Sequence, residues 1–272
     1  MEDKELNIDY LMGKTDEKPL DEPVSDGGFV GIFRKIACIG DSLSSGEFEG
    51  LRESDGAKLY IDRFDYSWGQ YMARMAGVTV YNFSRGGMTA KEYMESFANN
   101  MGYWQGSLAA NAYIIALGVN DISNKNLKIG TREDVDLEDH RKNAPTFAGY
   151  YSAIIQRYKK IQPEAKFFLV TIPRYAEDFP AEDEERKAQH RELLHDLARL
   201  FDNTYVIDLY EHAPIFDKKI KEKFFSGHMT PAGYMFFAKM MTSYIDYIIR
   251  HNLEDFKTVG LMGFDYDRTK IQ

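Results

Sequence analysis

Four residues in this sequence carry the groups needed to transfer an acyl group: Ser42, Gly87, Asn120 and His228. A serine hydroxyl attacks a carbonyl carbon when a histidine removes its proton. Backbone amides of Ser42 and Gly87, with the side-chain amide of Asn120, would hold the oxyanion that forms. Ser42 is therefore the candidate nucleophile, and His228 is the candidate general base.

The turn that carries Ser42 directly follows a short apolar stretch, Ile36–Ile39. Gly40 lets the chain turn sharply, and Asp41 with Ser42 can cap the segment that follows. Taken alone, this turn is more typical of a helix cap than of an active site. His228 alone is likewise typical of a polar residue at the start of a helix. The chemical interpretation therefore depends on the fold bringing these residues together.

Five apolar stretches alternate with helix-like segments and predict an α/β fold. They cover residues 36–39, 78–83, 112–117, 167–172 and 205–209. Continuous apolar runs are typical of strands buried on both faces, so we predict a three-layer α/β/α sandwich with a five-stranded parallel sheet. Parallel strands end at one edge, where Ser42, Gly87 and Asn120 would meet.

The chain shows no internal repeat or linker, and we predict one main domain at residues 34–252. An extended arm at residues 1–33 would precede it, and a tail at 253–272 would pack on it. Residues 47–64 are rich in glycine and charge and lack clear periodicity. We expect them to form a long connection near the ligand crevice.

Composition and charge exclude several classes of partner. A net charge of −9 without a long basic block argues against nucleic acid and against an anionic membrane surface. Cys38 is the only cysteine, so no intrachain disulfide can form. His190 and His195 are five residues apart, which does not suit two ligands on one helix face. We expect no metal and no cofactor.

The N-terminal residues lack the basic start and apolar run of a signal peptide, which predicts a cytoplasmic protein unless a signal has been trimmed. The sequence leaves open whether the chain forms a homo-oligomer.

Four short blocks of this sequence, in order, resemble the SGNH/GDSL hydrolase family of esterases and lipases. They are Gly40-Asp41-Ser42-Leu43, the glycine of Gly87-Met88-Thr89, Gly118-Val119-Asn120-Asp121, and His228. The resemblance covers about residues 34–250. It implies a flavodoxin-like sheet, no metal, and ester or thioester hydrolysis through an acyl-serine. It also implies Ser42 as nucleophile and first oxyanion donor, Gly87 and Asn120 as further donors, and His228 as base.

One position departs from the family pattern, because Phe225 stands where the family usually has an aspartate, three residues before the histidine. The chain would then be an inactive copy, or a Ser-His dyad oriented by a backbone carbonyl near Phe225. A third alternative is that another acid, such as Asp208, Glu211 or Asp217, reaches His228. We favour the dyad, since the acid mainly fixes the histidine tautomer and stabilises the imidazolium.

Four other residues have weaker assignments. Asp41 and Asp121 could form an acid/base pair as in glycoside cleavage, but we interpret them as supports that bond to turn amides. Trp68 and Arg85 are weak candidates for substrate contact, because aromatic and guanidinium groups suit sugar or acid surfaces. Core packing for Trp68 and a surface ion pair for Arg85 are the competing interpretations.

The sequence thus favours a serine esterase that removes an acetyl or short acyl group, with a small-molecule or carbohydrate ester as substrate. One alternative is a ligand-binding protein without catalysis on a degenerate scaffold, motivated by Phe225. Another is an O-acyltransferase, which would use the same residues with a sugar hydroxyl in place of water.

Overall fold

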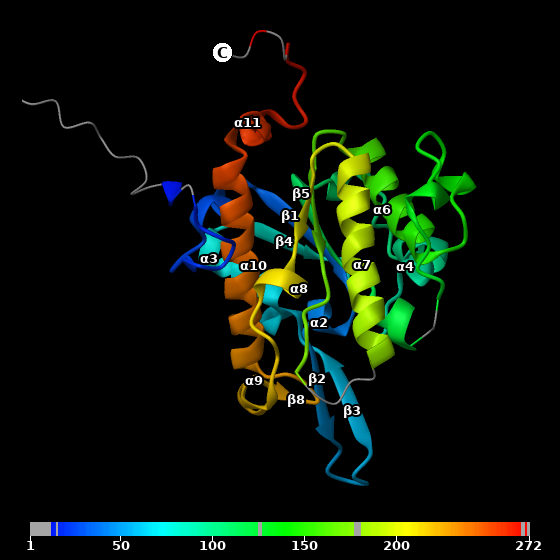
Figure 1. Cartoon of the computed structure of the whole chain (residues 1–272), viewed down its shortest axis with the longest axis vertical. Coiled ribbons are helices and arrows are strands. Elements are labelled where there is room, and N and C mark those ends of the chain that lie inside the picture. Colours follow the sequence, from blue (N-terminus) through cyan, green and yellow to red (C-terminus); the bar gives the residue numbers. More distant parts are fainter. Residues whose placement is uncertain (1–11, 15, 125–126, 177–180, 268–269, 271–272) are drawn as a thin grey trace, which may run out of the picture.

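Five parallel strands form the central sheet of the protein, shown in Figure 1 as a computed structural model. The structure describes residues 12–14, 16–124, 127–176, 181–267 and 270. In spatial order the strands are β4 (Thr79–Asn82), β1 (Lys35–Gly40), β5 (Ala112–Ala116), β6 (Lys166–Val170) and β7 (Thr204–Ile207). Numbered along the chain, this is the 2-1-3-4-5 order of flavodoxin-like sheets. The predicted five-stranded α/β fold is confirmed.

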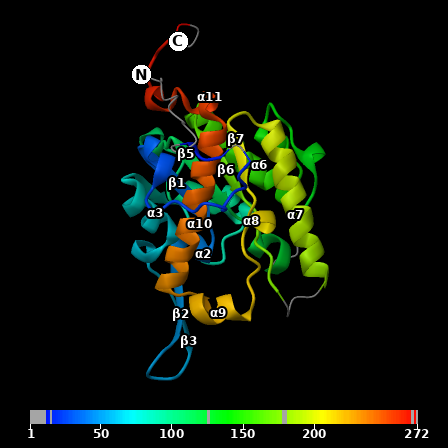
Figure 2. The ribbon, with the colours of Figure 1, turned by 60° about the vertical axis from the view of Figure 1, so that its left-hand side comes forward.

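Helices cover both faces of the sheet, as Figures 1 and 2 show. One face carries α3 (Trp68–Ala76) and α10 (Pro231–His251), and the other carries α4 (Ala90–Glu92), α6 (Phe147–Ile161) and α7 (Ala181–Leu200). Alternation along β1 explains the two layers, because successive strand residues point to opposite faces. Ile36 and Cys38 pack in the core under α10, whereas Ala37 and Ile39 pack in the core under α6.

Short polar caps fix where the core helices α6 and α10 begin. Thr146 accepts a hydrogen bond from the Gly149 amide at 3.2 Å and starts α6. Thr230 accepts from the Gly233 amide at 3.1 Å and starts α10, with Pro231 as its first residue. The segment after α4 continues as a π-helical turn at residues 93–97 and ends in α5 (Ala98–Asn100). No helix in the described ranges is long and apolar enough to cross a membrane.

Residues 47–64, expected to be an irregular connection, instead form an antiparallel hairpin. Its strands are β2 (Glu47–Leu51) and β3 (Lys58–Asp62), joined by a turn that contains Gly56 at φ +68°. That expectation was wrong because most side chains of this hairpin are partly or fully exposed, so no apolar alternation marks the strands. Figures 1 and 2 show the hairpin projecting away from the sheet.

Smaller elements complete the chain around α10. They are α2 (Ser42–Ser45), α8 (Leu209–His212), α9 (Lys218–Phe224), β8 (Phe225–Ser226), β9 (His228–Met229) and α11 (Leu253–Phe256). The segment before β1 is tied to α10 by hydrogen bonds from the Val24 amide to Ser243 Oγ at 3.0 Å and from the Phe29 amide to Asp246 Oδ1 at 2.7 Å.

Candidate active site

The turn after β1 places Ser42 at the first position of α2. Asp41 caps this short helix by accepting a hydrogen bond from the Leu43 amide at 3.1 Å. Only glycine fits at position 40, because a Cβ atom there would lie 2.1 Å from Ser44 Oγ. The sequence Gly-Asp-Ser therefore turns the chain sharply and presents Ser42 at the carboxyl end of β1.

Two hydroxyl groups hold the backbone of this turn in place. Tyr234, buried in α10, donates a hydrogen bond to the Glu47 carbonyl at 2.7 Å and lies 3.4 Å from the Ser42 carbonyl. Ser45 donates to the Ser42 carbonyl at 3.2 Å. These contacts join the candidate nucleophile to the start of the hairpin.

Asn120 links the turns after β1, β4 and β5. Its side-chain amide donates to the Met88 carbonyl at 3.1 Å and to Asp41 Oδ2 at 3.4 Å. Gly87, next to Met88, has φ +71°, a conformation that favours glycine. A Cβ atom on Gly87 would meet no other atom within 4 Å, so the backbone conformation, and not a close neighbour, requires glycine there.

Asp41 and Asp121 are both buried beside these turns. The Asp121 carboxylate accepts from the Ala90 amide at 2.9 and 3.1 Å, which ties the turn after β5 to the start of α4. Burial raises the pKa of Asp41 to about 6 and the pKa of Asp121 to about 7. These contacts fit the interpretation of both carboxyl groups as supports.

The raised pKa of Asp121 predicts a stability that falls as pH rises. Between about pH 4 and 7 the unfolded state loses this proton while the folded state keeps it, so the free energy of unfolding decreases with pH. A shift of this size amounts to about 4 kcal/mol. We expect Asp121→Asn to gain stability relative to wild type, by a few kcal/mol, as pH rises from 4 to 7. Urea unfolding of wild type and Asp121→Asn across this range measures the difference between their free energies of unfolding. A difference that does not change with pH would contradict the prediction.

His228 lies on β9, after a turn at Gly227, and its imidazole sits between two carboxylates of the hairpin. Nε2 lies 3.1 Å from Glu47 Oε1, and Nδ1 lies 3.5 Å from Glu49 Oε2. The Nδ1 atom is buried and has no hydrogen-bond partner among the described residues. The Tyr60 ring packs edge-on against the imidazole at 5.8 Å between centroids.

One cavity of about 800 Å³ brings the four predicted residues together. It is lined by Asp41, Ser42, Leu43, Glu47, Gly87, Val119, Asn120, Tyr175, Lys221, Glu222, Phe225, Gly227 and His228. Ser42, Gly87, Asn120 and His228 thus line one space. Sequence reasoning missed Glu47 on the hairpin, Tyr175 in the segment after β6, and Lys221 with Glu222 on α9, none of which belongs to a motif.

Two other predicted residues lie elsewhere. The Trp68 side chain is fully buried against Phe237 in the core, so the expected substrate contact is not supported. Arg85 lies outside the cavity lining, pairs with Glu92 and stacks over the Phe97 ring.

Asp208, considered as a substitute acid, is committed to other partners. It accepts from Arg191 Nε at 2.7 Å, lies 2.9 Å from His195 Nε2, and caps α8. Burial acts to raise the pKa of Asp208, but these hydrogen bonds outweigh burial and lower the pKa to about 2. The structure does not bring this carboxylate to His228.

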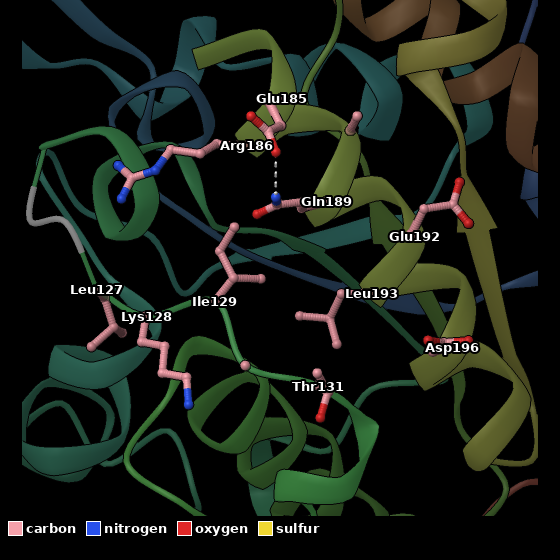
Figure 3. A pocket seen from close by; sticks show the side chains of 12 residues that line it. Leu127, Lys128, Ile129, Thr131, Glu185, Arg186, Gln189, Glu192, Leu193 and Asp196 are labelled. Carbon is pink, nitrogen blue, oxygen red and sulfur yellow. Dashed lines mark hydrogen bonds between the residues drawn. The ribbon is translucent and has the colours of Figure 1, made fainter. Parts of the chain in front are cut away.

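A second hollow of about 720 Å³ lies between residues 127–131 and α7 (Figure 3). Ile129 and Leu193 lie near its centre, and Glu185, Glu192 and Asp196 lie around them. Its described lining includes no serine, cysteine or histidine. Within the described ranges, no group of three or more His, Cys, Asp or Glu residues could hold a metal ion. The acyl-transfer groups are therefore gathered in the cavity beside Ser42.

A model of the GDSL-like Lipase/Acylhydrolase family matches residues 38–236 of this chain. A family two carbohydrate esterase from Clostridium thermocellum, in complex with cellohexaose, is 17% identical, with a TM-score of 0.56 over 86% of this chain and 66% of that chain. A carbohydrate esterase family 2 enzyme with a carbohydrate-binding domain, from Corynascus thermopiles (Myceliophthora fergusii), is 18% identical, with a TM-score of 0.52 over 78% of this chain and 65% of that one.

A family 3 carbohydrate esterase from Clostridium thermocellum is 16% identical, with a TM-score of 0.50 over 80% of this chain and 98% of that one. Comparison with curated proteins gave no match. At these identities the structural similarities show the fold alone.

Proposed function

This chain belongs to the GDSL-like lipase/acylhydrolase family, and from that membership we propose that it is a serine esterase. It would hydrolyse a carboxylic ester with an acetyl or short acyl group through an acyl-serine intermediate. The observation that carries this proposal is that Ser42, Gly87, Asn120 and His228, from four separate segments of the chain, line one cavity.

The proposed reaction follows from these groups. Ser42 Oγ attacks the ester carbonyl while His228 takes the hydroxyl proton. The amides of Ser42, Gly87 and Asn120 stabilise the oxyanion of the tetrahedral intermediate. Collapse of this intermediate expels the alcohol, which receives the proton from His228. A water molecule, deprotonated by His228, then attacks the acyl-serine. The resulting tetrahedral intermediate collapses, the proton passes from His228 to Ser42 Oγ, and the acid is released.

We propose an acylated carbohydrate as the substrate. The cavity has the size of a small-molecule site, and Lys221, Glu222 and Tyr175 line it with groups that can bond to sugar hydroxyls. The carbohydrate esterases that share this fold support the same choice.

Phe225 is the observation that favours a second candidate, a binding protein without catalysis, because it lines the cavity where the family usually has an acid. An O-acyltransferase remains a variant of the first proposal, since a sugar hydroxyl can replace water in the second step. The reaction in its minimal form needs only a Ser42–His228 dyad.

The test is the release of acetate from p-nitrophenyl acetate and from an acetylated xylo-oligosaccharide. We expect both esters to be hydrolysed at rates proportional to protein concentration, with loss of activity after treatment with a fluorophosphonate. Addition of unacetylated oligosaccharide distinguishes a transferase from an esterase, because a transferase would move the acetyl group to the added sugar. Calorimetric binding of the acetylated sugar without turnover of either ester would contradict the esterase and support the binding protein.

A further inference from the structure

The hairpin beside the cavity supplies two carboxylates to His228, although Phe225 replaces the usual acid of the family. Building on the proposed function, we propose that Glu49 is the positioning residue that orients His228 and stabilises its imidazolium. Glu49, on the hairpin that follows Ser42 in the chain, would thus replace the aspartate that the family usually has three residues before the histidine.

The strand register aims this side chain at His228. Glu47 and Glu49 are two residues apart on β2, so they share one face of the strand. The intervening Phe48 points the other way and packs edge-on against Tyr66 and Tyr234, with centroids 5.8 and 5.6 Å away. The aromatic contacts of Phe48 therefore fix which face of β2 meets the histidine.

The turn before His228 is shaped around the same carboxylate. Gly227 has φ +73°, and a Cβ atom on it would lie 2.2 Å from Glu49 Oε2. Any larger residue at this position would push Glu49 away from the imidazole. The glycine thus permits close contact between β2 and the loop that carries His228.

The two ring nitrogens face different surroundings, and this difference selects Glu49 over Glu47. His228 and Glu47 line the cavity with Ser42, whereas Glu49 is not part of its lining. The acid of a serine hydrolase binds the nitrogen opposite to the one that serves the nucleophile. Nδ1, buried and without a hydrogen bond among the described residues, lies 3.5 Å from Glu49 Oε2. A shift of about 0.6 Å would make this a normal hydrogen bond.

The charges around the hairpin keep Glu49 ionised. Lys58 on β3 lies 2.7 Å from Glu49 Oε1, and its ammonium holds the pKa of Glu49 below the usual range. Glu47 differs, because burial raises its pKa. Glu47 also lies 3.1 Å from Nε2, the nitrogen that must serve Ser42, so it is not on the side of the ring that an orienting acid takes.

The test compares Glu49→Gln, Glu49→Asp and Glu47→Gln with the control Glu53→Gln, which changes an exposed glutamate of the same hairpin. We expect Glu49→Gln to lower kcat about 10²- to 10⁴-fold, with KM within about threefold of wild type. The acidic limb of the kcat/KM–pH profile, which reports the free enzyme's base, should move to lower pH. Glu49→Asp should recover part of the lost rate, and Glu53→Gln should match wild type.

Nitrogen NMR of His228 gives a readout that does not depend on activity. We expect wild type to keep the neutral ring protonated at Nδ1, and Glu49→Gln to lose that single tautomer while melting within a few degrees of wild type. A wild-type esterase whose Glu49→Gln variant keeps its rate and tautomer would overturn the role of Glu49 but leave the proposed function intact. A large loss of kcat in Glu47→Gln, and not in Glu49→Gln, would also overturn the role of Glu49. An inactive wild type would reject the proposed function itself.

Discussion

Replacing Ser42 by alanine is expected to lower kcat for p-nitrophenyl acetate about 10⁴- to 10⁶-fold, because the nucleophile of the acyl-enzyme route is removed. The residual rate would come from the oxyanion donors and from binding alone. Initial rates at equal protein concentrations, fixed by absorbance, measure the loss. KM for the residual reaction should change little, since Ser42 is partly exposed at the cavity and its hydroxyl is not seen to bond any of the described residues.

The matched control is Ser54→Ala, which changes an exposed serine at the turn of the hairpin and should retain wild-type rates. Circular dichroism and thermal melting check that both variants fold. Equal rates for Ser42→Ala and wild type would contradict the assignment of Ser42.

Replacing His228 by alanine is expected to lower kcat by a similar factor, about 10⁴- to 10⁶-fold, because Ser42 then has no base. The two residues act as one unit, so the double variant Ser42→Ala/His228→Ala should be no slower than either single variant. The remaining rate of His228→Ala should rise in proportion to hydroxide concentration. Initial rates from pH 6 to 10 measure both expectations.

His251→Ala serves as the control for a histidine outside the cavity. His251 is exposed at the end of α10, where its ring stacks on Tyr247. We expect it to keep the wild-type rate and pH profile. Independent, multiplicative losses for Ser42 and His228 would show that they do not act on the same proton.

The central sheet was predictable because its strands are short apolar runs bounded by turns. β1 and β5 are buried along nearly their whole length, so burial on both faces leaves a continuous apolar signal in the sequence. The parallel arrangement then placed Ser42 and Asn120 near one edge. That edge lies on the described cavity, which also holds His228 from outside the sheet.

The acid beside His228 was not predictable, because it depends on contacts between distant residues. Glu49 and His228 are far apart in sequence, and their proximity requires β2 to pair with β3 and to lie against β9. Neither strand of the hairpin has a buried apolar face that reveals its register. A charged strand that contains glycine has the sequence pattern of a loop, and only its tertiary contacts identify it as a strand.

Residue type also failed to separate core from cavity for aromatic side chains. Trp68 has the amphipathic indole expected at a sugar site, yet its ring is fully buried in the layer under α10. Phe225, expected to matter only as a missing acid or through a backbone carbonyl near it, lines the cavity. Both side chains are large and apolar, and only the packing of the helices decides which one is accessible.

The most direct test of the account is to locate a covalent fluorophosphonate label by mass spectrometry. Trypsin should release the peptide Ile36–Arg52, which contains Ser42, Ser44 and Ser45. We predict that fragment ions place the label on Ser42 alone, that His228→Ala greatly slows labelling, and that an acetylated sugar protects against it. Absence of the label from this peptide, or its attachment to Ser44 or Ser45, would contradict Ser42 as the nucleophile.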